Sequence, residues 1–287
     1  MQIVTDGAAD ITAEQQQGLK IHFVPISFTL DGKSYRSGVD IQPDEFYRLI
    51  ESTPSFPTTS QPSPGEFAEL YQELAKSDPE ILSIHVSSGL SGTVNAARLG
   101  ASLAPEAKVT FYDTRNLSGA QGWQVVAAAR AAQAGWEMQR ILSILPGLTA
   151  ATDTLYTLAT LKYLIHGGRI SHIRGLFGSL LDIKPIIGVN KEDGKYVQRG
   201  SGRSLRKSIP SLVDVVARQH PPGSELRVQV LHGNNEEGAA LLREKFESTF
   251  RCTFLPTSPI APVLGAHTGS GLVGAAYAPQ AAYADLP

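Results

Sequence analysis

The fold of this chain is decided by the stretch Ser83-Ile84-His85-Val86-Ser87-Ser88-Gly89-Leu90-Ser91-Gly92-Thr93. Its first residues belong to an apolar run from Ile81 to Val86, which predicts a buried strand. A loop of small residues follows, and the next segment, from Val94 to Arg98, favours a helix. Strand, loop and helix together predict a βα turn, the place where open α/β sheets bind ligands. Because hydroxyls and backbone N–H groups there face the positive end of a helix, we expect an anionic ligand.

This loop does not match three well-known phosphate-binding or catalytic motifs. A P-loop needs a lysine, and the loop contains none. A nucleophile elbow needs a glycine two residues after the serine, whereas Thr93 follows Ser91 at that distance. The dinucleotide-binding pattern of three glycines is also absent. The loop is therefore interpreted as a neutral cradle for an anion, and a tight turn with solvated hydroxyls is the alternative.

The composition narrows the class of protein. The chain has 287 residues and a formal net charge of -2, which argues against a nucleic-acid partner. A single cysteine, Cys252, excludes a disulfide framework and fits a reducing compartment. No run of about 18 apolar residues predicts a membrane span, and the first residues enter a strand at once, leaving no room for a secretory signal. We expect a cytoplasmic α/β protein.

Strands and helices alternate up to about residue 150. Helix starts are indicated by capping boxes at Thr12 and Ser63 and by Pro43, and Asp31-Gly32 is a hairpin signal. The loop Pro57–Glu66 is expected to be ordered, and it lies one helix before the strand that leads to Ser91. The expected strands cover Ile3–Asp6, Ile21–Leu30, Ile81–Val86 and Val109–Tyr112, and two further helices cover Gly122–Ala134 and Glu137–Leu145. This alternation predicts a doubly wound, mostly parallel sheet.

The pattern changes after that point. Asp193-Gly194 joins two expected strands, Ile183–Val189 and Lys195–Arg199, and so predicts antiparallel pairing. The tail Pro262–Gly271 is interpreted as a glycine-rich loop. Helices are expected at Leu205–Gln219 and Glu236–Phe250, with a strand at Leu226–Leu231 between them. We predict an N-terminal α/β domain at residues 1–152 and a second α/β domain, with a mixed or antiparallel sheet, at residues 153–287.

Four spaced motifs resemble those of the DegV family. They are Thr59-Ser60-Gln61-Pro62-Ser63, Ser87-Ser88-Gly89-Leu90-Ser91-Gly92-Thr93, Gly167-Gly168-Arg169-Ile170-Ser171 and Asp182-Ile183-Lys184-Pro185-Ile186. The resemblance runs from Thr5-Asp6 to the tail Gly265–Gly269, so it covers nearly the whole chain. Members of this family are bacterial fatty-acid-binding proteins, among them the binding subunit of fatty acid kinase.

The resemblance implies a function and a set of site residues. A long-chain fatty acid would bind between two domains, with its carboxylate held by Thr59, Ser91 and the tail residue His267. The protein would present this acyl group to a separate ATP-using kinase subunit for acyl-phosphate formation, without catalysing a reaction itself and without a cofactor. The resemblance also leaves room for a transient contact with a membrane surface.

For the other candidate residues, a purely structural role is the alternative to a functional one. Ser88, Gly92 and Arg169 are candidates for further head-group or loop contacts, although Arg169 could simply cap carbonyl groups. Arg203 and Arg206 belong to a basic cluster that is either a docking site for the kinase or a solvated face. His85 lies inside a strand and is interpreted as a core histidine, and no cluster has the spacing of metal ligands. Apolar residues that could line the site are Phe28, Leu90, Ile165, Leu176, Phe177 and Leu180.

Three features depart from the family pattern. Gly7 stands where the family usually has a serine, which would remove one head-group hydroxyl. Ser270 stands where the tail usually has a proline. The segment Leu117–Trp123 is also atypical, so no acyl-chain preference is inferred.

Two functions of other classes stay open at this stage. A serine hydrolase or thioesterase would use Ser91 with His85 or His267, but no acidic residue is clearly placed to orient either histidine. A small-molecule phosphotransferase would bind its anion in the same loop, but a nucleotide-binding motif is absent.

Overall fold

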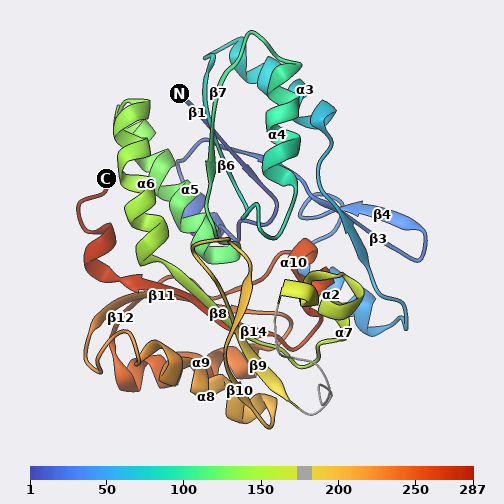
Figure 1. Ribbon diagram of the computed structural model, residues 1–287, viewed down its shortest axis with the longest axis vertical. Coiled ribbons are helices and arrows are strands. Elements are labelled where there is room, and N and C mark those ends of the chain that lie inside the picture. The colour runs from blue at the N-terminus through green and yellow to red at the C-terminus, as the bar shows by residue number, and fades with distance from the viewer. Residues whose placement is uncertain (173–182) are drawn as a thin grey trace.

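The computed structural model describes residues 1–172 and 183–287 (Figure 1). A parallel sheet of four strands, in the order β2-β1-β6-β7, is built from the first half of the chain. A mixed sheet of seven strands, with the order β10-β9-β8-β14-β11-β12 and with β13 beside β11, is built from the second half. A small antiparallel sheet, β4-β3-β5, stands apart from both. The predicted fold class is therefore confirmed.

The element bounds of the first half are β1 (Gln2–Asp6), α1 (Ala13–Gln16), β2 (Ile21–Val24), β3 (Ser27–Leu30), β4 (Lys33–Arg36), α2 (Pro43–Glu51), β5 (Thr58–Ser60), α3 (Pro64–Ala75), β6 (Glu80–His85), α4 (Thr93–Ser102), β7 (Lys108–Asp113), α5 (Ser118–Gln133) and α6 (Met138–Ala151). Those of the second half are β8 (Asp153–Thr157), α7 (Lys162–His166), the 3-10 helix η1 (Arg169–His172), β9 (Lys184–Val189), β10 (Tyr196–Gly202), α8 (Leu205–Val216), β11 (Glu225–His232), α9 (Glu236–Thr249), β12 (Arg251–Phe254), β13 (Ser258–Pro259), α10 (Pro262–Thr268), β14 (Val273–Pro279) and η2 (Gln280–Tyr283).

The helices form layers around the two large sheets. Helices α3 and α4 cover one face of the parallel sheet, and α5 covers the other (Figure 1). Helix α5 also packs against β14 and β8 of the mixed sheet, so it lies between the two sheets. Most of its side chains are buried, which explains why this alanine- and glycine-rich helix has no clear polar face. Helices α8 and α9 cover the outer face of the mixed sheet.

Several local signals in the sequence are confirmed. Thr12 and Ser63 form the predicted capping boxes at the starts of α1 and α3. Asp31 and Gly32 both have positive φ angles, of 51° and 77°, as a two-residue hairpin turn requires, and they join the antiparallel strands β3 and β4. The predicted hairpin at Asp193-Gly194 likewise joins β9 to β10 in antiparallel pairing.

Three sequence interpretations are wrong. The single strand expected at Ile21–Leu30 is two strands, β2 and β3, in different sheets, because Pro25 has no N–H group to continue the ladder. The loop expected around Thr59 contains the short strand β5, which pairs with β3. The tail expected as a glycine-rich loop is the helix α10. In addition, α5 and α6 are longer than expected, and α6 continues through Pro146.

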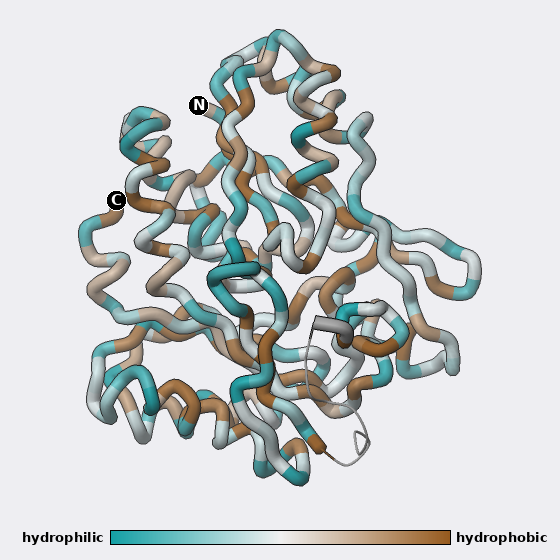
Figure 2. The backbone as a smooth tube through the Cα atoms, in the orientation of Figure 1, coloured by the Kyte–Doolittle hydropathy of each residue, from teal (hydrophilic) through white to brown (hydrophobic). Residues whose placement is uncertain are grey.

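The two halves of the chain are in close contact. Sheet membership changes between α6 and β8, which is where we place the domain boundary, and the boundary at residue 152 stays a prediction. The largest buried hydrophobic cluster contains residues of both halves, and hydrophobic segments run through both sheets (Figure 2). Ser87 Oγ donates a hydrogen bond of 2.8 Å to the carbonyl oxygen of Gly194, so the loop after β6 contacts the β9–β10 hairpin directly.

In the described part of the chain, no helix is both long and apolar enough to cross a membrane. The expected lining residues Leu176, Phe177 and Leu180, and the motif residue Asp182, lie outside the described residues.

Candidate functional site

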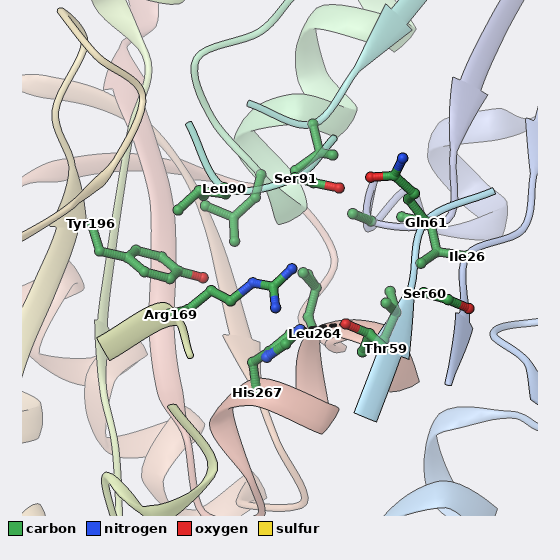
Figure 3. Close-up of a pocket in the computed structure, with 14 residues that line it drawn as sticks. Ile26, Thr59, Ser60, Gln61, Leu90, Ser91, Arg169, Tyr196, Leu264 and His267 are labelled. Carbon is green, nitrogen blue, oxygen red and sulfur yellow. Dashed lines mark hydrogen bonds between the residues drawn. The ribbon is translucent and has the colours of Figure 1, made fainter. Parts of the chain in front are cut away.

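A cavity of about 340 Å³ lies where the loops after the strands of both halves meet, and we call it the first cavity (Figure 3). Its polar side chains come from five separate segments, and the rest of its wall is aliphatic. The lining residues are Ala8, Ile26, Thr59, Ser60, Gln61, Val86, Leu90, Ser91, Leu117, Arg169, Tyr196, Val263, Leu264 and His267. All three residues named as carboxylate ligands, Thr59, Ser91 and His267, are among them.

Thr59 and His267 form a hydrogen-bonded pair in this cavity. Thr59 Oγ1 lies 2.8 Å from His267 Nε2, although 208 residues separate them in the chain. Strand β5 places Thr59 opposite Phe28, a fully buried residue of β3. Helix α10 carries His267 in its last turn. The pair therefore joins a strand of the first half to a helix near the end of the chain.

The imidazole of His267 is neutral near pH 7. Burial, together with the nearby charge of Arg169, lowers the pKa of His267 from 6.5 to about 4. Its Nδ1 atom is buried and is not hydrogen-bonded within the described residues. A buried N–H donor without an acceptor is rare in proteins, so the favoured tautomer carries its proton on Nε2. In that tautomer Nε2–H donates to Thr59, and the threonine hydroxyl keeps its own proton for another acceptor.

Ser91 approaches the first cavity from the loop that leads into α4. Its Oγ lies 2.8 Å from Thr93 Oγ1 and accepts a bond of 3.3 Å from the backbone N–H of Thr93. Its own N–H bonds to the carbonyl oxygen of Ser87 at 3.1 Å, which fixes the turn. The predicted βα turn thus holds Ser91 by local bonds, with its hydroxyl at the cavity wall.

Arg169 brings a positive charge into the site. Its Nη1 donates a bond of 2.7 Å to the carbonyl oxygen of Gly167, and Figure 3 shows the guanidinium extending into the space between Tyr196, Ser91 and His267. The neutral cradle expected from the loop residues alone does not include this charge, although Arg169 is one of the candidates for head-group contact. The guanidinium still has donors that can meet a carboxylate, because five N–H groups form its planar fork.

The other candidate residues do not line the cavity. Ser88 is exposed and turns away, with its hydroxyl bonded to Asp113 at 2.5 Å. Gly92 does not line the cavity, but its lack of a side chain allows Gln61, which does, to approach: a Cβ atom at this position would be 2.1 Å from Gln61 Oε1. Arg203 and Arg206 are exposed near the start of α8.

The geometry does not favour a serine hydrolase. Within the described residues, the hydroxyl of Ser91 bonds to Thr93 and not to a histidine. His85 does bind an aspartate, since its Nδ1 lies 3.0 Å from Asp6 Oδ2, and its Nε2 lies 2.7 Å from Ser83 Oγ. These three residues are 0% exposed. They form part of the core, where no substrate can reach the serine.

The departures from the family pattern have local explanations. Gly7 lines a second cavity of about 550 Å³ rather than the first. The lack of a serine hydroxyl at this position therefore removes no hydroxyl from the proposed carboxylate site. Ser270 donates a hydrogen bond to Glu51 at the end of α2, which fastens the tail loop. Ser118, in the atypical segment, has a positive φ of 56° and donates its hydroxyl proton to Asp10.

Sequence reasoning missed part of the lining. Tyr196 has no role in the sequence analysis, although it lies two residues after Gly194, which contacts the Ser87 loop. Val263 and Leu264 were assigned to a loop, and their position on α10 turns them toward the cavity. Of the apolar residues expected at the wall, Leu90 lines the first cavity, whereas Phe28 is core and Ile165 is half exposed. In residues 1–172 and 183–287, no group of His, Cys, Asp or Glu could hold a metal ion.

Comparison with known proteins agrees with this arrangement. The family model of the DegV family matches residues 1–280. A DegV domain-containing protein of Listeria innocua is 35% identical over 273 residues, covering 95% of this chain and 96% of that protein. One of Deinococcus radiodurans is 34% identical and covers 97% of this chain and 96% of its own length.

Solved structures show the same fold. The structure of DegV, a fatty acid binding protein from Bacillus subtilis, superimposes with a TM-score of 0.87 at 29% identity, covering 97% of this chain and 99% of that one. A structure described as fatty acid binding of a DegV family protein from Thermus thermophilus gives a TM-score of 0.85 at 28% identity, with coverage of 97% and 99%. The chain therefore belongs to the DegV family.

Proposed function

We propose that this protein binds a long-chain fatty acid in the first cavity, with the carboxylate at Thr59, Ser91 and His267. The observation that carries the proposal is the uneven chemistry of the cavity. Hydroxyls, an imidazole and a guanidinium are grouped together, and much of the remaining wall is aliphatic. A ligand with one anionic end and one apolar end matches both parts. The related proteins of known structure from Bacillus subtilis and Thermus thermophilus, which are described as fatty acid binding, support the same ligand class.

The energetics of such a ligand are reasonable. Burial of about 14 methylene groups contributes roughly 11 kcal/mol at about 0.8 kcal/mol each. The loss of translational and rotational freedom opposes this by several kcal/mol. A buried carboxylate without partners would cost several kcal/mol more. Hydrogen bonds from Thr59 and Ser91 to the charged head group can offset that cost, at about 1.5–3 kcal/mol each.

The neutral imidazole of His267 fixes the direction in which the Thr59 hydroxyl donates its proton. Since Nε2–H of His267 donates to Thr59 Oγ1, the threonine proton is free to point at the ligand. Arg169 adds electrostatic attraction from the opposite side of the cavity. In this arrangement the carboxylate accepts bonds from Thr59 and Ser91, whereas His267 acts through Thr59.

We infer further that the protein presents its ligand to an ATP-dependent kinase subunit and does not itself catalyse a reaction. Arg203 and Arg206 are the proposed docking residues, and their exposure supports that role. They follow β10, whose other end carries Tyr196 at the first cavity. A strand of seven residues spans about 20 Å, so the docking surface would lie about that far from Tyr196, outside the first cavity. We place this activity in the cytoplasm, with transient contact to membranes that supply the fatty acid.

Identification of the bound ligand tests the proposal. The protein is purified, denatured and extracted, and the extract is analysed by mass spectrometry. We expect a long-chain fatty acid at close to one molecule per chain. Protein that yields no acyl species, and that after purification does not bind added hexadecanoate, would contradict the proposal. A nucleotide in the extract, or an acyl group covalently attached to Ser91, would point to the other two classes of function.

A further inference from the structure

Helix α10, which carries His267, is held at its start by two side chains from the other half of the chain. Asp10 Oδ1 accepts a bond of 2.8 Å from the N–H of Ala261, the N-cap residue of α10. Ser37 Oγ accepts a bond of 3.1 Å from the N–H of Val263, two residues later. The first N–H groups of a helix have no partner within the helix, so both anchors meet a requirement that α10 cannot meet itself.

The position of α10 depends on such contacts. The helix has seven residues, and isolated helices of that length are not stable in water. Gly265 lets Phe46 and Tyr47 of α2 approach closely, since a Cβ atom there would lie 2.5 Å from Phe46 and 2.8 Å from Tyr47 Oη. The residue at the far end, His267, contacts Thr59 across the first cavity. A shift at the start of α10 therefore moves the histidine that orients the proposed carboxylate ligand.

Asp10 sits in an uncommon environment for an acidic side chain. It is 8% exposed and accepts a second hydrogen bond from the hydroxyl of Ser118, at the start of α5. Within the described residues it forms no ion pair. The ionisable groups that face it are the phenols of Tyr47 on α2 and Tyr156 on β8. Asp10 also lines the second cavity.

We propose that Asp10 is a positioning residue for the fatty-acid site: by holding the first turn of α10, it sets the place at which His267 meets Thr59. This proposal rests on the proposed function, because ligand affinity is its main readout. The ionised carboxylate makes charge-assisted bonds to Ala261 and Ser118, and such bonds are roughly twice as strong as neutral ones. The negative charge also lies near the positive end of α10.

Protonation of Asp10 weakens this anchor near neutral pH. Burial raises the pKa of Asp10 from 3.8 to about 7, against the opposing effect of its bonds to Ser118 and Ala261. The neighbouring groups do not titrate in that range, since burial raises the pKa of Tyr47 and of Tyr156 well above 10, and the pKa of His267 is about 4. Between pH 6 and pH 8 Asp10 therefore changes charge while these three groups do not.

The test compares the binding of hexadecanoate to delipidated wild-type protein and to Asp10→Asn from pH 5.5 to pH 8. The asparagine has the shape of the protonated acid and keeps an acceptor for Ala261. We expect equal affinities at pH 5.5 and a threefold to tenfold tighter wild type at pH 8, since the ionised fraction of a group with a pKa of about 7 changes about tenfold between pH 6 and pH 8. Titration of the ligand's carboxyl group affects binding to both proteins equally, so the ratio of the two affinities at each pH does not depend on it.

Two further variants serve as controls. Ser37→Ala removes the neutral anchor of the same turn, so it should lower affinity by the same factor at every pH. Gln16→Ala changes another residue of the second cavity, which forms no hydrogen bond to α10 within the described residues, and should bind like wild type.

Thermal stability separates positioning from general damage. The pKa of Asp10 is higher in the folded than in the unfolded protein, so the stability from its protonated form is present below pH 4 and is lost as the pH rises through 7. Asp10→Asn avoids the cost of a buried charge and should therefore melt at a higher temperature than wild type at pH 8, while binding more weakly.

Equal affinities of Asp10→Asn and wild type across the whole pH range would overturn the role of Asp10 and leave the proposed function intact. Absence of binding by wild-type protein would refute both.

Discussion

Removal of the hydroxyl of Thr59 should weaken ligand binding without disturbing the fold. Valine is the suitable replacement, because it has the shape of threonine and favours the strand conformation of β5. The substitution Thr59→Val removes the bond of 2.8 Å to His267 and, in the proposed complex, the bond to the carboxylate.

The size of the effect follows from these two bonds. A hydrogen bond to a charged group contributes about 1.5–3 kcal/mol, so the dissociation constant for hexadecanoate should rise about 10- to 100-fold. The loss of the acceptor for His267 Nε2–H affects the free and the bound protein alike. It therefore lowers the free energy of unfolding by about 1–3 kcal/mol, before any gain from the added methyl group. It does not change the affinity for the ligand.

Titration calorimetry with delipidated protein measures the affinity, and Thr59→Ser is the matched control. Serine keeps the hydroxyl at the same position, so its affinity should stay within about threefold of wild type. The double variant Thr59→Val with His267→Gln gives the coupling between the two side chains. Since His267 acts through Thr59, the losses of the single variants should not add.

An unchanged affinity of Thr59→Val would refute this account of the site. So would strictly additive losses in the double variant, because they would mean that Thr59 and His267 act on the ligand independently. Circular dichroism and the melting curve show whether each variant is folded before its affinity is interpreted.

Three other predictions test separate parts of the structure. Ser91→Ala should weaken hexadecanoate binding by about 1–3 kcal/mol while the fold is retained, as measured by the same calorimetry. Arg203→Glu with Arg206→Glu should leave the binding free energy for fatty acid within about 1 kcal/mol of wild type, but should slow acyl-phosphate formation with a cognate kinase tenfold or more. Normal turnover would mean that both residues are only solvated surface residues. Gly89→Ala should lower the melting temperature, with a cost of about 1–3 kcal/mol, because its Cβ would lie 2.3 Å from the carbonyl oxygen of Asp193. A Gly89→Ala protein as stable as wild type would mean that the two halves can separate there without cost.

The parts of the site that could be predicted from the sequence are those set by local rules. The loop around Ser91 follows a strongly apolar strand and precedes a helix, and both neighbours are evident from short patterns. The hairpin at Asp193-Gly194 depends on Gly194, which has a positive φ of 68°. The position of Arg169 in the cavity could not be derived in this way, because it depends on how the two halves of the chain pack against each other.

The short strand β5 shows a second limit. Three residues are too few for an alternating pattern, and the prolines around them indicate a loop. Pairing with β3 makes Thr58–Ser60 a strand, and β3 itself is separated from β2 by Pro25. The direction of the Thr59 side chain is thus determined by a partner strand that the sequence pattern had merged with its neighbour.

Helix α10 is the element on which the site depends most and which the sequence indicates least. Gly265 inside the segment disfavours a helix by local propensity, and the segment lacks a side-chain cap of its own. The missing interactions are supplied from far along the chain, by Asp10 and Ser37 at its start and by Thr59 at its end. A helix that is stable only through such contacts takes its position from them. A change in any one contact should therefore change the position of His267. This dependence explains both why the tail was misread as a loop and why a buried acid outside the first cavity can control the affinity of the ligand within it.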